Sequence, residues 1–428
     1  MRILAVDVGT GTQDILVFDS SASIENALQL IMPSPTQIAG GRIRRATAQR
    51  RAVALSGVIA GGGPCHWALE DHLRAGFAAY ATPEAAATFD DDLDQVQRLG
   101  VTLVSPDQLL ALDADHVELR DLDLDAIRTA LSAFDVDTDF DGLALGCLDH
   151  GAAPPGYSDR LFRFDHLRRV VERRNDLLAF AYLPEELPDY LTRARTLVSC
   201  ADEGVPTVFL DTGPAAALGA LQDPNVACRD EQLVLNLGNM HALAFHLQGT
   251  RIISLYEHHT GELTAEQVED FTERLLNGDL PHEDVFSSKG HGVYYATESA
   301  SSPVGAQHAT QPLHTSTHQD PSQPAHPAEG ISTAPTRPDS RHSEPRGAMG
   351  GGGEGEESRR TVHAQHSARP FVAVTGPQRG KLRGSRLNPY FAVPHGDMMV
   401  SGCFGLLTAF AEKHSEAREV IHSALRTA

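Results

Sequence analysis

The sequence is poor in lysine and has no long apolar run. Lysine occurs only as Lys289, Lys381 and Lys413 among 428 residues, and the formal net charge is -22 with a pI near 5.3. Because binding to nucleic-acid phosphates needs clustered positive charge, this balance argues against a nucleic-acid partner. No apolar stretch approaches the length that spans a bilayer, so we also expect no membrane partner.

Cysteine is scarce as well. The chain has five cysteines, an odd number, and they lie far apart in the sequence: Cys65, Cys147, Cys200, Cys228 and Cys403. This usage is typical of reduced thiols in a cytosolic protein. The first residues, MRILAVDVGT, enter a strand-like segment without a charged leader, which predicts no signal peptide. We therefore expect a cytoplasmic protein.

Residues 296–369 differ in composition from the rest of the chain. They are rich in Ser, Pro, Gly, Gln and His and have almost no aliphatic side chains. Such a segment cannot bury enough apolar area to offset its ordering entropy, so we predict a disordered insertion between the strand-like segments 293–297 and 370–376. Its histidines could bind metal adventitiously, but a solvated tract of biased composition explains them better: His308, His314, His318, His326, His342, His363 and His366.

Outside this segment, short β-rich runs alternate with helical patterns, which predicts an α/β architecture. Two halves are indicated, residues 1–200 and 201–428. The first has expected strands at 3–6, 15–18, 53–60, 140–147 and 177–183 and helices at 64–75, 123–134 and 160–173. The second has expected strands at 232–238, 242–247 and 251–256, followed by a helix at 264–276 that Thr264 begins. A duplicated lobe is the natural inference, with a ligand cleft between the two copies.

Each half begins with a tight hairpin that carries glycine and small polar residues. In the first, glycines let the backbone approach an anion, hydroxyls add donors, and Asp7 can hold a hydrated magnesium ion: Asp7, Gly9, Thr10, Gly11 and Thr12. The second repeats the layout with Asn236, Gly238 and Asn239. Two facing hairpins can hold a nucleotide's β- and γ-phosphates, whereas each alone is equally typical of a hairpin turn without a ligand.

With these two hairpins the chain resembles the actin, sugar-kinase and heat-shock-chaperone ATPase superfamily. The resemblance implies a two-lobed, duplicated fold of the ribonuclease-H-like type, with ATP and Mg²⁺ as ligands. It covers nearly the whole chain except 296–369. The superfamily carries an aspartate in many members where this chain has Asn236, and an amide supplies no negative charge to a metal shell.

A third segment, TVFLDTGPAAALGAL at 207–221, strengthens the resemblance. Sugar kinases have a catalytic base at the matching point, which makes Asp211 the candidate general base toward a substrate hydroxyl. The alternative is that Asp211 only caps the helix that follows. By the same resemblance Gly376 belongs to the adenosine loop, although Pro377 and Gln378 stand where a second glycine is usual. Gly396, Asp397 and Gly402 are expected on the nucleotide side.

Further polar clusters follow expected strands. Asp149 and His150 come directly after a buried-looking strand and are candidate substrate contacts, or alternatively a local turn. The glycines of GGGPCHW, residues 61–67, suit either a ligand-facing loop or the entry of a helix. A metal site from His258, His259, His395 and Asp397 would require the fold to bring them together.

Several of these motifs together are similar to a small prokaryotic family whose members bear the name pyruvate formate-lyase activating enzyme. The radical chemistry in that name needs three closely spaced cysteines for an iron–sulfur cluster, and no two cysteines here are that close. The leading functional hypothesis is therefore a Mg-ATP-dependent phosphotransferase or ATPase acting on a small molecule. The alternative is a nucleotide-regulated binding or activation protein with little catalysis.

Overall fold

The computed structural model describes residues 1–297 and 370–426. These residues belong to one compact unit. The predicted insertion at 296–369 lies outside the described residues except for its first two positions. Within the described ranges, no helix is both long enough and apolar enough to cross a membrane.

The first sheet has six strands and contains the N-terminal hairpin. Its spatial order is β3 (Leu28–Pro33), β2 (Thr12–Asp19), β1 (Arg2–Val8), β8 (Gly142–Cys147), β10 (Thr207–Asp211) and β9 (Ala181–Tyr182). The strands β1, β2 and β3 are antiparallel neighbours, whereas β8 runs parallel to β1, and β10 runs parallel to β8. The central strands are buried along their length, as their continuous apolar sequence predicts.

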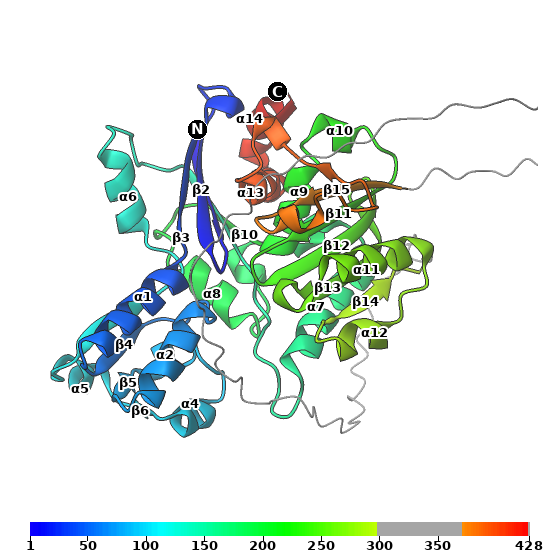
Figure 1. The fold of residues 1–428 in the computed structure, drawn as a ribbon. Coiled ribbons are helices and arrows are strands. Elements are labelled where there is room, and N and C mark those ends of the chain that lie inside the picture. The colour runs from blue at the N-terminus through cyan, green and yellow to red at the C-terminus, as the bar shows by residue number, and fades with distance from the viewer. Residues whose placement is uncertain (298–369, 427–428) are drawn as a thin grey trace, which may run out of the picture. The chain divides into compact units, whose positions relative to one another are not determined.

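The second sheet repeats this plan. Its order is β14 (Gly292–Tyr295), β13 (Arg251–His259), β12 (His241–Gln248), β11 (Gln232–Leu237), β15 (Phe371–Thr375) and β16 (Tyr390–Phe391). Again the first three strands, β11, β12 and β13, are antiparallel neighbours, while β15 runs parallel to β11 and β16 runs parallel to β15. The second sheet also has a fourth antiparallel strand, β14, beside β13. The repeated order is that of the duplicated, ribonuclease-H-like ATPase fold, so the predicted fold class is confirmed (Figure 1).

A third sheet is inserted into the first half and was not predicted. It is entirely parallel, in the order β6 (Val101–Leu103), β5 (Ala79–Ala81), β4 (Val53–Gly57) and β7 (Asp115–Leu119). The run 53–60 was predicted as a strand of the first half, and its residues Val53–Gly57 do form a strand, in this third sheet. Helices accompany this sheet along the chain: α1 (Pro35–Ala48), α2 (Pro64–Arg74), α3 (Pro83–Ala86), α4 (Leu93–Leu99) and α5 (Pro106–Leu110).

The four helices predicted at 64–75, 123–134, 160–173 and 264–276 begin and end close to those bounds, as α2, α6 (Leu124–Ser132), α7 (Asp159–Arg173) and α11 (Ala265–Asn277). The other helices are α8 (Thr192–Ser199), α9 (Thr212–Ala220), α10 (Pro224–Ala227), α12 (His282–Ser287), α13 (Ser401–Lys413) and α14 (Ser415–Arg426). Thr264 caps α11 in a capping box with Gln267, and Gly278 ends the helix in the left-handed region. The run 177–183 was predicted as a strand, but it forms a 3₁₀ turn followed by the two-residue β9.

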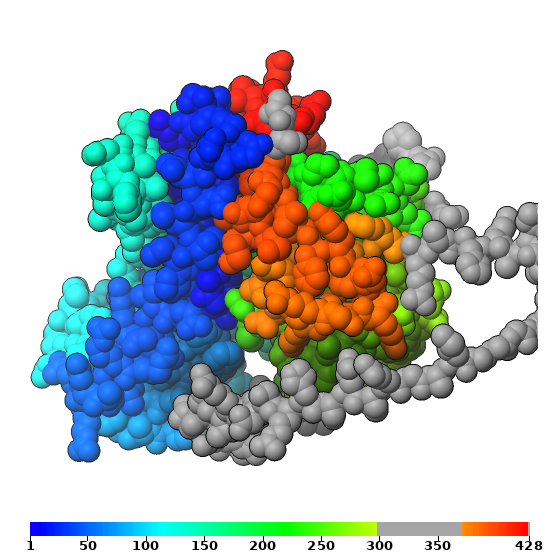
Figure 2. Space-filling view, turned by 45° about the horizontal axis from the view of Figure 1, so that its top comes forward, coloured from blue at the N-terminus to red at the C-terminus, as the bar shows by residue number. Residues whose placement is uncertain are grey.

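Helices α9 and α13 pack against each other with almost no side chain between them. A Cβ atom added at Gly219 would overlap the backbone of Ser401, and one at Gly405 would overlap the backbone of Ala215. The apolar core around this pair includes residues of both six-stranded sheets, such as Leu210 and Phe245. Figure 2 shows the C-terminal part of the chain, in orange and red, directly against the blue N-terminal strands.

The boundary between the predicted halves stays a prediction. Strand β10 lies beyond residue 200 in the sequence yet pairs with β8 in the first sheet. The strands that flank residues 298–369, β14 and β15, both belong to the second sheet.

Candidate functional site

The first predicted phosphate loop is the turn between β1 and β2. The Gly9 N–H donates to the Thr12 carbonyl at 2.9 Å, which closes the turn. A Cβ at Gly9 would lie 3.0 Å from that carbonyl oxygen, so a larger residue would crowd the turn. Across the hairpin Asp7 pairs in register with Asp14, which places two carboxylates at the same end of the strands.

The second loop, between β11 and β12, has the same construction. The Gly238 N–H donates to the His241 carbonyl at 2.9 Å, and a Cβ at Gly238 would lie 2.8 Å from that oxygen. The two loops therefore share their closing hydrogen bond as well as their place in the duplicated fold. Each presents its turn at the same end of its sheet's first strand.

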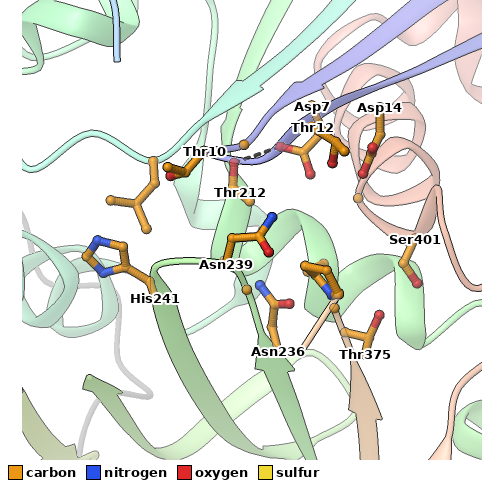
Figure 3. A pocket seen from close by; sticks show the side chains of 18 of the residues that line it. Asp7, Thr10, Thr12, Asp14, Thr212, Asn236, Asn239, His241, Thr375 and Ser401 are labelled. Atoms are coloured by element: carbon orange, nitrogen blue, oxygen red, sulfur yellow. Dashed lines mark hydrogen bonds between the residues drawn. The ribbon is translucent and has the colours of Figure 1, made fainter. Parts of the chain in front are cut away.

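The two loops touch. A Cβ atom at Gly11 would overlap the side-chain amide of Asn239, so glycine at this position lets the loops approach each other. Figure 3 shows Thr10 and Thr12 of the first loop facing Asn236 and Asn239 of the second. The space between them belongs to a pocket that is open to solvent.

This first pocket collects most of the predicted nucleotide residues. Its lining includes Asp7, Gly9, Thr10, Thr12, Asn236, Gly238, Asn239 and Gly376. Gly11 contacts Asn239 instead, and neither Gly396 nor Asp397 lines the pocket. The backbone near them does, through Met398 and Met399.

Several lining residues were missed from the sequence. They come from the facing strand of the first hairpin, the end of β15, the 3₁₀ turn Arg379–Leu382 and the start of α13: Asp14, Thr375, Arg379 and Ser401. Gly402, which was expected on the nucleotide side, lines the pocket as well. The hairpin register would have identified Asp14, because it lies seven residues after Asp7 across a tight turn. Nothing local in the sequence marks Ser401. A Cβ at Gly402 would overlap the carboxylate of Asp7, so α13 lies against the first loop.

The two carboxylates of the first hairpin, the buried Asp7 and the partly buried Asp14, lie close together, and their burial and proximity disfavour the charged forms. Burial, and then the neighbouring Asp14 carboxylate, raise the pKa of Asp7 to about 7. Burial raises the pKa of Asp14 to about 6. The Asp7 Oδ1 atom accepts a hydrogen bond from the Thr212 hydroxyl at 2.7 Å, whereas the buried Asp14 Oδ1 has no partner among the described residues. A pair of carboxylates with an unpartnered oxygen fits a hard divalent cation such as Mg²⁺.

The candidate base, Asp211, is engaged in structural contacts. Its Oδ1 atom accepts from the Gly213 N–H at 3.0 Å, which caps α9, and from Arg163 Nη2 at 3.0 Å. Its Oδ2 atom lies 2.5 Å from Arg163 Nη1. Asp211 is buried and does not line the pocket between the loops. The geometry thus corresponds to the capping alternative, with a buried ion pair added.

Arg163 links Asp211 to a second buried carboxylate, Glu257. The guanidinium Nε lies 3.3 and 3.4 Å from the two Glu257 oxygens, and both side chains are fully buried. Burial alone would lower the pKa of Arg163, but the two carboxylates outweigh it and hold that pKa above its ordinary value. Burial alone would raise the pKa of Glu257, and Arg163 instead holds it well below its usual range. The contacts of Asp211 in this network are all with groups of the protein itself.

A second pocket adjoins the first. It is lined by the glycine loop 61–63, by residues of the α3–α4 connection such as Asp91, and by the segment after β8. Gly9, Thr10, Leu148, Arg193, Met240 and His241 line both pockets. The glycines of GGGPCHW therefore face a pocket as well as preceding α2, so both interpretations of that motif hold.

The two predicted substrate contacts, Asp149 and His150, both line this second pocket. Asp149 is buried, and its two oxygens accept from the backbone N–H groups of Gly151 at 2.8 Å and Ala194 at 2.9 Å, so it holds the local turn. Burial raises the pKa of Asp149. His150 lies against His241 and His291, and burial lowers its pKa well below the ordinary value.

The other predicted metal group is not assembled. His258 contacts the His259 carbonyl and the Ser288 hydroxyl, while His395 packs on Phe404. Among the described residues these histidines do not meet Asp397 in a common cluster.

A family model matches residues 60–314, more than half of the chain, and its description is "Putative pyruvate format-lyase activating enzyme (DUF1786)". The chain belongs to this family. No curated protein matches the chain in sequence. Family members are named for an activating enzyme, but the three buried cysteines, Cys65, Cys147 and Cys403, join no metal-ligating group within the described ranges. The cysteine arrangement does not fit the iron–sulfur cluster of radical activating enzymes.

Solved structures that match this family member include a ROK hexokinase from Thermus thermophilus and a Ppx/GppA family protein from Aquifex aeolicus. The hexokinase is 13% identical, with a TM-score of 0.21, and the match covers 59% of this chain and 48% of the hexokinase. The Ppx/GppA protein is 11% identical, with a TM-score of 0.23, and the match covers 66% of this chain and 63% of that protein. The chain thus spans about half the length of the hexokinase that it matches.

Proposed function

We propose that the chain is a Mg-ATP-dependent phosphotransferase that holds the nucleotide phosphates between its two hairpin loops and a small acceptor molecule in the second pocket. The observation that carries this proposal is the wall shared by the two pockets, which includes Gly9 and Thr10. A phosphoryl group bound by these two residues would stand at the boundary of the second pocket. An acceptor hydroxyl there could attack it in line.

The residues of the first pocket suit a nucleotide triphosphate. The turns at Gly9 and Gly238 bring backbone close to the ligand, and the hydroxyls of Thr10 and Thr12 add donors. Arg379 of the lining adds positive charge, whereas the charge of Arg193, which also lines the pocket, is paired with Asp121. Asp7 and Asp14 would hold Mg²⁺ through its water shell, and the bound ion would neutralise charge on the β- and γ-phosphates.

Transfer to an acceptor hydroxyl requires a general base, such as a carboxylate that the substrate can reach. Asp211 is bonded on both oxygens and is buried away from the pockets. Asp91 lines the second pocket, and its pKa is raised to about 6, mainly by desolvation and then by Asp149. A carboxylate with a pKa close to the working pH is effective as a general base. We therefore assign the base to Asp91 within this proposal.

The second candidate function is a nucleotide-regulated binding or activation protein. Asn236 supports it, because an amide at this position supplies no charge for a metal ion and no base for hydrolysis. In that case nucleotide binding would close the pocket without transfer of the phosphoryl group.

The first experiment measures nucleotide binding by calorimetry with and without Mg²⁺. We expect Mg-ATP to bind the wild type and Asp7→Asn to weaken binding at least tenfold in the presence of Mg²⁺. Asp19→Asn, at the far end of the same hairpin and outside the pocket, is the matched control and should bind as the wild type does. Equal binding by Asp7→Asn and the wild type would refute the phosphate-loop assignment.

The second experiment separates transfer from binding. ADP release is measured against a panel of small hydroxylated metabolites selected by their effect on the melting temperature. Asp91→Asn should lower acceptor-stimulated turnover by roughly two to four orders of magnitude, the usual contribution of a general base, and leave ATP binding intact. Asp90→Asn is the matched control, since Asp90 is the adjacent carboxylate in the sequence and does not line the pocket. If ATP binds but no acceptor stimulates turnover, the regulatory alternative is favoured.

A further inference from the structure

Three histidines from separate parts of the chain meet at the edge of the second pocket. His150 follows β8 of the first sheet, His241 begins β12, and His291 immediately precedes β14 of the second sheet. Each offers one ring nitrogen, and these three nitrogens lie within 4.8 Å of one another. Among the described residues this is the one group of three or more His, Cys, Asp or Glu side chains with such spacing.

The spacing is close to that of a metal centre. A tetrahedral ion about 2.05 Å from each imidazole nitrogen places pairs of ligand nitrogens about 3.3 Å apart. The Nε2 atoms of His150 and His291 are 3.4 Å apart. Only small side-chain rotations would bring the third nitrogen to the same distance.

The second ring nitrogen of two of these histidines is free to orient the ring from behind. The Nδ1 atoms of His241 and His291 are buried and have no hydrogen-bond partner among the described residues. His241 Nδ1 lies 3.5 Å from the Glu257 Oε1 atom, so a slight rotation would make the carboxylate its partner. A carboxylate behind a ligating imidazole fixes the ring and strengthens it as a ligand.

A cluster of neutral, hydrogen-bonded imidazoles is the alternative. It accounts for the contact between His150 and His291, because one Nε2 can donate to the other. It does not account for His241, whose ring lies 5.0 Å from each of the other two rings without a hydrogen bond between them.

We propose that His150, His241 and His291 bind one divalent transition-metal ion of the zinc class, with an open coordination position toward the second pocket. Three imidazoles select zinc, cobalt, nickel or copper over magnesium, which prefers oxygen ligands. His150 and His241 line the pocket, so its contents can supply the fourth ligand, an oxygen of water or of a small molecule. This site is separate in chemistry from the Asp7 and Asp14 carboxylates, and it does not depend on nucleotide binding.

The test uses the full chain, stripped with a chelator and titrated with Co²⁺ without nucleotide. We expect one equivalent of Co²⁺ to give the intense visible absorption of a four-coordinate ion, which Zn²⁺ abolishes by displacement and excess Mg²⁺ does not. His150→Ala and His241→Ala should each lose this absorption. His166→Ala removes a buried imidazole outside the cluster and is the matched control, which should retain it.

Comparison with the variants also removes the signal of any Co²⁺ that binds to histidines elsewhere in the chain, including those between residues 308 and 366. These are identical in the wild type and the variants, so the readout is the difference spectrum. The proposal is overturned if the wild type gives no four-coordinate spectrum, or if His150→Ala and His241→Ala give the same spectrum as the wild type. Should His241→Ala fail to fold, His150→Ala carries the comparison by itself, because His150 contacts fewer buried groups of the second sheet.

Discussion

Replacement of Asp211 should change the stability of the protein far more than its chemistry. Asp211→Ala removes both charged hydrogen bonds at 2.5 and 3.0 Å from a guanidinium that has no solvent exposure. It also removes the cap of α9 at Gly213. Breaking a buried ion pair by removing one partner costs about 3–5 kcal/mol, and loss of a cap costs about 1 kcal/mol.

The remaining carboxylate, Glu257, limits the loss. It stays 3.3 Å from Arg163, so the guanidinium keeps one charged partner. We therefore expect Asp211→Ala to lower the free energy of unfolding by about 3–5 kcal/mol in total. Asp211→Asn keeps an oxygen for the cap and should lose less.

Urea denaturation followed by circular dichroism measures this change, with the slope m compared between variants. The matched control is Asp202→Ala, which breaks a partly exposed pair with Arg128 and should cost less than about 1 kcal/mol. The reasoning is refuted if Asp211→Ala unfolds within about 1 kcal/mol of the wild type yet loses acceptor-stimulated turnover. That result would restore Asp211 as the general base.

Two further predictions concern glycine and histidine. Gly41→Ala in α1 has open space around its Cβ and should stabilise the protein by about 0.5–1 kcal/mol, whereas Gly402→Ala in α13 would overlap Asp7 and should lower both the melting temperature and the affinity for Mg-ATP. Stabilisation by Gly402→Ala would contradict the contact with Asp7. Burial, and then Arg163, lower the pKa of His166 to about 3, below the unfolded value of about 6.5. Its contribution to stability is therefore present above pH 6.5 and is lost as the pH falls toward 3, and between pH 7 and 5 the loss is about 2 kcal/mol. His166→Gln should remove this part of the acid sensitivity in urea titrations at the two pH values, and an unchanged pH dependence would show that His166 is not the group responsible.

The elements that depend on local patterns were predicted well. The helix 264–276 and the hairpins at both starts have strong local signals, namely a capping box, a glycine-rich turn and apolar runs. The predicted strand at 53–60 had the same local signal, but its sheet is determined by long-range pairing with β5 and β7. Periodicity cannot specify which sheet a buried parallel strand joins.

The site shows the same division. The turn residues Gly9 and Gly238 were predicted because the chemistry of a tight hairpin is local. The ion pair between Asp211 and Arg163 was not predictable, because the two residues are 48 positions apart and meet only in the folded chain. The meeting of His150 with His291, 141 positions apart, has the same cause.

The backbone contact between α9 and α13 limits how these two helices can move relative to each other. With no side chains between Gly219 and Ser401, or between Gly405 and Ala215, the two helices cannot separate by repacking. They can slide along one another, which is a shear motion. Because α13 begins with Ser401 and Gly402 in the pocket and continues to the C-terminal helix α14, such a displacement would transmit the state of the phosphate loops to the opposite end of α13.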